Sequence, residues 1–397
     1  MTHFAEVKSG ANRRFTFDVD NVDLSIVNAL RRVILAEVPN VAFAFDPYED
    51  VNNDIRFTNN TSSLHNEFMG HRISLIPINL TLKEIKEWDP ANFGFRINMK
   101  NEGTEMLLVT SKQIEVIDGM GEQVSSEVRN RWFPEDPITN DHVLITKLKA
   151  NPFNPKEGEC FECDMRARKG TAKQHSRWSH VSLCSFINKI DEPAAQEAYK
   201  QMMKQIDPSL TDEEKNRIIN RFNCIDRLRI FSKNKYGEPS RFTFSIETVN
   251  SMVLAHELVT TAFEILIDKI KQVASPEKSE IHCLNPAEHM FMIKIRDEGH
   301  TIGNMLQSLI FNMYMRDEKL IQYVGYYQPH PLENDVVIKL RHDQLDTESQ
   351  VRDFLAESCR IIEQQLVDLK LEWVQANGTV LAAPAKPPKK TGRKKII

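Results

Sequence analysis

The stretch 15-FTFDVDNVDLSIVNALRRVILAEVP-39 joins two different periodicities. Its first part places Phe15, Phe17 and Val19 at alternate positions, as a half-buried strand does. Its second part carries apolar residues three and four positions apart behind Asp23, a residue type that caps helix N-termini, and it ends at Pro39. The stretch predicts a strand followed by an amphipathic helix that buries Val27, Leu30, Ile34 and Val38.

The same order of elements returns late in the chain. Phe291, Ile293 and Ile295 occupy alternate positions, and Thr301 is a candidate cap for the helix that follows. This degenerate repeat predicts two units of similar structure. The apolar positions of the second helix are Ile302, Met305, Leu306, Leu309 and Met313.

Each unit also closes with a long amphipathic helix. The first follows a strand with Phe242, Phe244 and Ile246 and carries Val259, Phe263, Leu266, Ile270 and Val273 on one stripe. The second begins at a capping box from Thr347 to Gln350, and we expect it to stop at Asn377-Gly378. Its stripe is Val351, Leu355, Ile362, Leu366, Leu369 and Trp373.

These apolar stripes are too broad to remain in water. We therefore expect the two units to pack helix on helix as a pseudo-symmetric pair within one molecule. The residues expected at this intramolecular contact are Val27, Leu30, Ile34, Phe263, Leu266, Ile270, Ile302, Met305, Leu306, Leu309, Leu355, Ile362 and Leu366.

A long insert separates the paired elements of the first unit. It contains strand-like runs at 105–109 and 113–117 and a charged helical region at 192–229. The expected fold is α+β, with antiparallel sheets and packed helices in both modules and a mainly-β insert. The expected domains are a first module at 1–43 and 241–274, an inserted domain at 44–240, a linker at 275–282, a second module at 283–376 and a disordered basic tail at 377–397.

Length, charge and cysteine content narrow the class of protein. A chain of 397 residues is too long for one ordinary hydrophobic core, which predicts more than one domain. The net charge of -5 gives no overall positive potential that would attract a phosphate backbone. Six dispersed cysteines are typical of reduced intracellular thiols. No run approaches the roughly 18 apolar residues that a membrane span needs, and the start lacks the apolar core of a signal peptide.

Several motifs resemble one family of proteins. Residues 27–39, VNALRRVILAEVP, and 60–77, NTSSLHNEFMGHRISLIP, are similar to the larger alpha-like subunit of cellular RNA polymerases, the third subunit of the eukaryotic enzyme and the bacterial alpha chain. Residues 144–148 and 167–179 resemble its later strands and its Lys-Gly to His to Trp stretch. Residues 298–306, EGHTIGNML, and 325–333, GYYQPHPLE, resemble its small partner, the eleventh subunit.

The resemblance implies a non-catalytic assembly subunit of a DNA-dependent RNA polymerase. Two alpha-like halves fused in one chain would replace the cellular heterodimer and nucleate the two large catalytic subunits. The implied partners are these two subunits, a small tenth-subunit-like chain and other polymerase subunits, with DNA reached only through the complex and no membrane. Magnesium and nucleotides belong to the large subunits, so no cofactor is expected here.

Two departures from the family pattern stand out. The larger cellular subunit often carries a cysteine cluster for zinc or an iron-sulfur centre after the Ile-Pro turn, whereas residues 78–159 contain no cysteine. Cellular lineages keep the two partners on separate chains, whereas large DNA viruses of eukaryotes have joined versions. The resemblance therefore implies a viral origin, with the protein in the host cytoplasm, in a viral factory or in the virion; a nuclear location stays open.

Two sets of residues invite a catalytic or metal-binding interpretation. Cys160 and Cys163 form a Cys-x-x-Cys pair, but in a strand this spacing places the thiols on opposite faces, and no second pair follows. His65, Glu67 and His71 lack the His-Glu-x-x-His spacing that places two imidazoles one helical turn apart. The pattern favours structural roles for all five residues.

Arg31 and Arg32 lie in an otherwise apolar helical stretch. From the residues alone, a solvated face is an equally good interpretation. In the family that the stretch resembles, the arginine-bearing helix helps to seat the large subunits, and guanidinium groups suit bidentate contact with carboxylates. The resemblance thus implies an interface with the large subunits at Asn28, Arg31 and Arg32.

The end of the chain is rich in lysine and proline and has six basic residues and no acid between 384 and 395. A nuclear import signal, a weak tether to nucleic acid and a plain solubilising tail all remain open. The main rival function is a stand-alone nucleic-acid-binding protein that uses this tail. A weaker rival is a zinc or thiol enzyme that uses Cys160 and Cys163.

Overall fold

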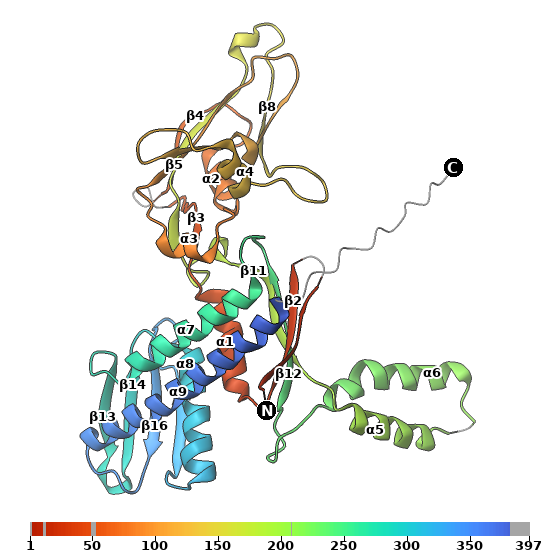
Figure 1. Ribbon diagram of the computed structural model, residues 1–397, viewed down its shortest axis with the longest axis vertical. Coiled ribbons are helices and arrows are strands. Elements are labelled where there is room, and N and C mark those ends of the chain that lie inside the picture. Colours follow the sequence, from red (N-terminus) through yellow and green to blue (C-terminus); the bar gives the residue numbers. More distant parts are fainter. Residues whose placement is uncertain (1, 11–12, 49–52, 208, 382–397) are drawn as a thin grey trace.

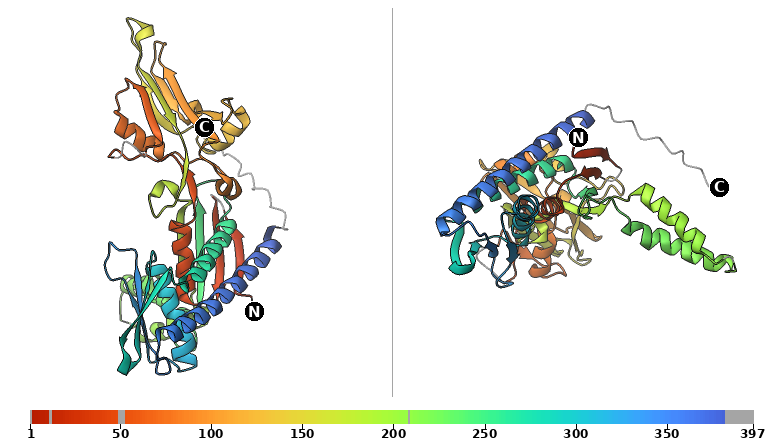
Figure 2. Two further views of the ribbon diagram at one scale, coloured as in Figure 1. Left: turned by 90° about the vertical axis from the view of Figure 1, so that its left-hand side faces the viewer. Right: turned by 90° about the horizontal axis from the view of Figure 1, so that it is seen from below.

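The computed structural model describes residues 2–10, 13–48, 53–207 and 209–381. The molecule is elongated, with the insert at one end, the second module at the other and the first module between them (Figure 1). A helical hairpin projects sideways from the first module, as Figures 1 and 2 both show.

The first module is a four-stranded antiparallel sheet in the order β1-β2-β12-β11, with two helices packed on one face. Alternation buries Phe17 of β2 and Phe244 of β12, which are register partners whose rings stack with centroids 5.1 Å apart. The elements are β1 (Phe4–Ser9), β2 (Arg14–Asp20), α1 (Leu24–Ala36), β11 (Val181–Asn188), β12 (Arg241–Thr248) and α7 (Ala255–Val273).

The second module repeats this topology. Its sheet has the order β13-β14-β16-β15, so each strand has a counterpart at the same place in the first sheet. Helix α8 follows the second strand, as α1 does, and α9 closes the module, as α7 does. The elements are β13 (Ser279–Asn285), β14 (Met290–Ile295), α8 (His300–Ile310), a π-helical turn (Phe311–Asp317), β15 (Tyr323–Tyr327), β16 (Val336–Arg341) and α9 (Glu348–Leu381).

The repeat corrects the expected boundary of the insert at residue 240. Strand β11, which the sequence analysis assigned to the insert, pairs with β12 along its length and is the counterpart of β15. The helical region at 192–229 also leaves the first module directly after β11, apart from the β-domain (Figure 1). Without β11, the edge of β12 would have unpaired backbone groups, so this strand is part of the first module.

The domain inserted between α1 and β11 is mainly β. A sheet in the order β4-β9-β5-β7 and a ribbon of β6 and β8 are covered by three short helices. A second ribbon, of β3 and β10, lies where the insert joins the first module. The elements are β3 (Asn40–Ala42), β4 (Ile55–Asn60), α2 (Asn66–Ser74), α3 (Leu82–Glu87), β5 (Phe93–Lys100), β6 (Leu107–Thr110), β7 (Glu115–Asp118), α4 (Ser126–Trp132), β8 (Leu144–Leu148), β9 (Cys160–Met165) and β10 (Arg168–Gly170).

The projecting hairpin consists of α5 (Glu192–Gln205) and α6 (Asp212–Arg221), which continues into a π-helical turn, Phe222–Asp226. Tyr199 of α5 and Phe222 of this turn pack with ring centroids 5.5 Å apart. Ala195 and Phe222 are buried, whereas α6 itself buries no residue among those described.

Three local expectations differ from the structure. Helix α7 ends at Val273 and β13 begins at Ser279, so the linker expected at 275–282 is shorter and the second module begins before residue 283. Helix α8 begins at His300 behind Gly299, so Thr301 is not its cap. Helix α9 continues past Gly378 to Leu381, because one interior glycine costs a helix only about 1 kcal/mol.

Counterpart helices pack against each other between the modules. Helix α1 contacts α8, and α7 contacts α9, which lies beside it along its length (Figure 2). Trp373 of α9 is fully buried among three phenylalanine rings of the first sheet, and its indole N–H donates to the His256 carbonyl at 3.1 Å. A single apolar core therefore runs through both modules and into the insert.

Among the helices of the described ranges, none combines the length and the apolar composition that crossing a bilayer requires.

Replacing Trp373 with alanine should lower the free energy of unfolding by about 3–5 kcal/mol, because the indole fills space between the modules. Urea unfolding followed by circular dichroism measures the change. Leu371→Ala is the matched control on the same helix, since this side chain is 56% exposed, and we expect a change within about 0.5 kcal/mol. Equal effects of the two substitutions would contradict this packing.

Gly170→Ala should destabilise the junction between the insert and the first module by about 1–3 kcal/mol, because the new methyl group would clash with the Trp178 ring. Gly94→Ala is the control, since a Cβ atom there meets nothing within 4 Å. Hydrogen exchange of the β3 and β10 amides reports the difference, and unchanged protection in Gly170→Ala would rule out the expected clash.

Candidate subunit interface

The thirteen residues expected at the contact between the modules are all buried and all belong to the continuous core. They lie on α1, α7, α8 and α9, the four helices that pack between the sheets. Because counterpart helices face each other, the contact is pseudo-twofold, as in a symmetric dimer.

Asp23 connects the two modules through polar contacts. Its carboxylate caps α1 by accepting from the Ser25 amide at 2.8 Å, as the sequence indicated. It also accepts from Asn312 Nδ2 at 2.7 Å and Ser308 Oγ at 3.2 Å, both in the second module. The residue that caps α1 therefore also holds α8 and the turn after it against the first module.

A partly buried ion-pair network, in which Glu298 is the buried member, lies at the other end of α1. Lys269 Nζ of α7 lies 2.8 Å from Glu37 Oε2, just after α1, and 2.9 Å from Glu298 Oε2, just before α8. Lys278 Nζ lies 3.6 Å from Glu298 Oε1. Burial lowers the pKa of Lys269, but Glu298 and Glu37 outweigh it and hold the pKa above the usual value.

A third contact joins a turn of the first module to the π-helical turn of the second. The Arg316 guanidinium lies over the rings of Tyr236 and Phe311, at 4.1 and 5.0 Å from their centroids, and makes a bidentate pair with Glu238 at 3.0 and 2.7 Å. Sequence reasoning missed this contact and the Lys269 network. The partners are distant in sequence, so no local pattern indicates these contacts. The sequence shows only that the residue types can form ion pairs and cation–π contacts.

The arginines of α1 lie beside a groove between the modules. Arg31 Nε and Nη2 donate to Asn28 Oδ1 at 3.1 and 2.9 Å, and Arg32 Nε donates to Thr301 Oγ1 of α8 at 2.7 Å. The groove has a volume of about 330 Å³, and both arginines line it together with Lys173, Glu37 and Glu298. The structure thus places two of the three predicted docking residues on a surface that both modules build.

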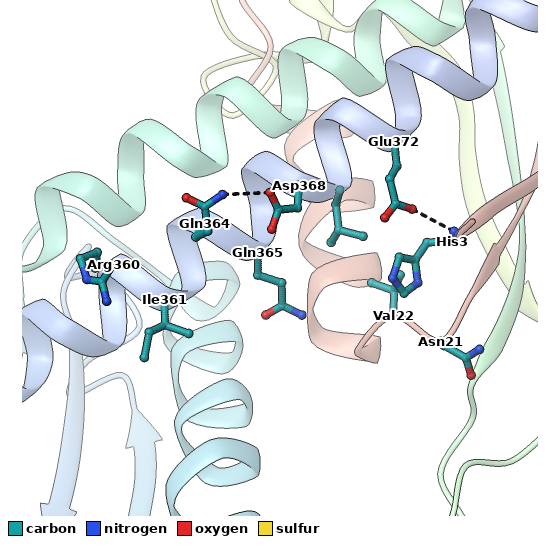
Figure 3. A pocket seen from close by; sticks show the side chains of 10 residues that line it. His3, Asn21, Val22, Arg360, Ile361, Gln364, Gln365, Asp368 and Glu372 are labelled. Atoms are coloured by element: carbon teal, nitrogen blue, oxygen red, sulfur yellow. Dashed lines mark hydrogen bonds between the residues drawn. The ribbon is translucent and has the colours of Figure 1, made fainter. Parts of the chain in front are cut away.

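A second cavity, of about 500 Å³, lies between α9 and the turn that precedes α1 (Figure 3). Several of its polar groups have partners: the His3 amide donates to Glu372 Oε2 at 3.0 Å, and Gln364 donates to Asp368 at 2.9 Å. Arg360 is paired with Glu357. This cavity is a seam between the modules, and several of the polar groups that line it already bond to one another.

The cysteine pair lies in β9, where Cys163 is buried and Cys160 is on the opposite, partly exposed face. Burial raises the pKa of the Cys163 thiol to about 12, which makes it a poor nucleophile and a poor metal ligand. Within the described residues, no three histidine, cysteine or acidic side chains are placed to hold a metal ion.

The histidines near α2 are also placed as structural or surface groups. His65 is the N-cap residue, but its side chain makes no capping bond and instead packs on Phe68 with ring centroids 4.5 Å apart. Glu67 and His71 are exposed on the helix. Arg72, which the sequence analysis did not single out, donates to the carbonyls of Leu144 and Ile145 and holds α2 on β8.

Two regions of the chain match the same kind of family model. Residues 16–270 and residues 291–372 each match a model described as the RNA polymerase Rpb3/Rpb11 dimerisation domain. The first match alone covers more than half of the chain and spans most of the first module together with the insert, and the second match lies within the second module.

Relatives are named RNA polymerase subunits in several organisms. The chain is 23% identical over 304 residues to DNA-directed RNA polymerase II subunit rpb3 of Dictyostelium discoideum, covering 68% of this chain and 92% of that protein. It is 26% identical over 299 residues to human DNA-directed RNA polymerases I and III subunit RPAC1, covering 64% and 79%. A conjugation stage-specific protein of Tetrahymena thermophila is 29% identical over 185 residues, covering 43% of this chain and 54% of that protein.

The repeated topology, the paired helices and these matches lead to one conclusion. The chain belongs to the family of alpha-like RNA polymerase subunits with the Rpb3/Rpb11 dimerisation domain, and it carries two matches to that domain in a single polypeptide.

Proposed function

We propose that this chain is the non-catalytic assembly platform of a DNA-dependent RNA polymerase, in which its two modules replace a heterodimer and nucleate the two large catalytic subunits. The observation that carries the proposal is the pairing of counterpart helices, α1 with α8 and α7 with α9, around one core. The names of the relatives, subunits of DNA-directed RNA polymerases, support it.

Fusion of the modules favours their pairing. Only residues 274–278 separate α7 from β13, so each module holds the other at a local concentration of about the millimolar range. Pairing therefore does not wait for a second chain to arrive. The platform is complete as soon as one polypeptide has folded.

The proposed contact with the large subunits lies on the face of α1 that bears Asn28, Arg31 and Arg32. Asn28 holds the Arg31 guanidinium in place, which lowers the entropy that the side chain loses on binding. Catalysis, magnesium and nucleotides belong to the large subunits in this proposal. A small tenth-subunit-like chain and further polymerase subunits complete the set of proposed partners.

The rival function is nucleic-acid binding by the basic tail expected at 377–397. Residues 377–381 belong to helix α9, which corrects the start of that tail, and residues 382–397 lie outside the described part of the chain. The net charge of -5 argues against binding by the body of the protein. We infer that the chain reaches DNA only through the assembled polymerase.

Arg31→Ala with Arg32→Ala should leave the protein folded and lower the amount of second-largest polymerase subunit that co-purifies with it by tenfold or more. The reason is that removing charged groups at an interface costs about 2–5 kcal/mol. Affinity purification of the full chain with quantitative mass spectrometry measures the loss. Arg217→Ala with Arg221→Ala, two exposed arginines on α6, is the control, and equal retention in both double variants would refute the docking role.

Deleting residues 384–397 should leave co-purification of the large subunits unchanged, because the paired modules lie upstream. The same truncated chain separates the rival function. If the tail were the functional element, the isolated full chain would bind DNA in a salt-sensitive manner and the truncated chain would not. If the truncated chain no longer co-purified with the large subunits, the tail would have a structural role in assembly, which would contradict this proposal.

A further inference from the structure

The groove beside Arg31 and Arg32 is assembled from three separate parts of the chain. Helix α1 contributes the two arginines, the segment after β10 contributes Lys173, and the second module contributes Thr301 and Gln328. The backbone amide of Lys173 donates to the Ala36 carbonyl at 2.8 Å, which fixes this segment beside the end of α1. The groove therefore exists only when the two modules are paired and the insert is folded.

The charges of this groove are unbalanced. Its two carboxylates, Glu37 and Glu298, are already paired with Lys269 and Lys278. Arg31, Arg32 and Lys173 have no carboxylate partner anywhere in the described chain, where the arginines bond only to the neutral groups of Asn28 and Thr301. Three cations that line one groove thus lack a carboxylate partner within the described residues.

The orientation of Arg32 depends on the second module. Its Nε–H donates to the Thr301 hydroxyl at 2.7 Å, across the contact between α1 and α8, while the remaining N–H groups of the guanidinium have no acceptor among the described residues. A guanidinium fixed on one edge presents its other edge for a bidentate contact with a carboxylate. Thr301 is therefore a positioning residue for this contact.

The groove continues along the second module into a hollow of about 460 Å³, which shares His300 and Gln328 with it. Tyr326, Tyr327 and Pro331 line the hollow, and the His300 and Tyr326 rings pack with centroids 5.9 Å apart. The cationic groove is thus bordered by an aromatic surface. An extended segment with acidic residues next to an apolar or aromatic residue matches both parts.

We propose that this composite groove receives an acidic segment of a large polymerase subunit, and that Lys173 and Thr301, with Arg31 and Arg32, make capture of that subunit conditional on the pairing of the two modules. The inference rests on the proposed function and adds the chemistry of the partner segment and two residues from outside α1. A chain whose two modules are not paired would therefore bind the large subunit weakly.

Lys173→Glu in the full chain tests the charge of the groove. We expect the second-largest polymerase subunit to co-purify at least tenfold less well than with the unaltered chain. The reason is that the new carboxylate would repel the carboxylate of the partner segment instead of attracting it. Lys112→Glu is the matched control, since Lys112 is also exposed but lies in the insert away from the groove, and it should retain capture. Equal capture by the two variants would overturn the proposal.

Thr301→Val tests the positioning role without a change of charge. We expect about a tenfold loss of capture, because a hydrogen bond to a charged group is removed, with the melting temperature of the isolated chain unchanged. Thr301→Ser, which keeps the hydroxyl, should restore capture. Full capture by Thr301→Val, or no rescue by Thr301→Ser, would exclude a positioning role.

Carbodiimide treatment of the purified complex provides a direct readout, because it joins an amine to a carboxylate in contact with it. We expect a crosslink from Lys173 to an aspartate or glutamate of a large subunit, found by peptide mass spectrometry. If no large subunit co-purifies with the unaltered chain, the proposed function itself fails. If the subunits co-purify but Lys173→Glu is neutral and Lys173 forms no crosslink, the proposed function stands and this inference fails.

Discussion

The structure depends on the burial of four helices between two sheets that the same polypeptide builds twice. Helices α1 and α7 carry broad apolar faces that their own sheet cannot cover completely. Helices α8 and α9 likewise have more apolar surface than the second sheet covers. Packing each helix on its counterpart removes both faces from water together. Trp373 shows how closely the modules depend on each other, since a residue near the end of the second module fills the core of the first.

Polar contacts at the edges of this core give the pair one defined arrangement. Asp23 accepts hydrogen bonds from the second module while it caps a helix of the first, and Lys269 is shared between Glu37 and Glu298. A buried charge without these partners would be costly, so a shifted pairing of the modules is disfavoured. The same arrangement brings Arg32 to Thr301 and creates the cationic groove, which links the intramolecular pairing to the proposed recruitment of the catalytic subunits.

Local signals predicted much of this fold. The cap at Asp23 and the capping box of Thr347 and Gln350 are present. The residues expected at alternate and helical spacings are buried, except Met313, which is half-buried in the π-helical turn after α8. The prediction was wrong where the outcome depends on distant partners. Strand β11 is recognised by its pairing with β12, and the Thr301 hydroxyl bonds to an arginine 269 positions away instead of capping α8. The resemblance pointed to the α1 arginines but gave no role to Lys173 or Thr301.

In the proposed assembly, the two modules pair within one molecule and this single molecule supports the large subunits. Native mass spectrometry of the complex purified through this chain tests it most directly, because it counts the copies of each polypeptide. We expect one copy of this chain with one copy of each of the two large subunits. Two copies of this chain in each complex, which would mean that modules pair between molecules, or a chain that carries no large subunit would contradict it.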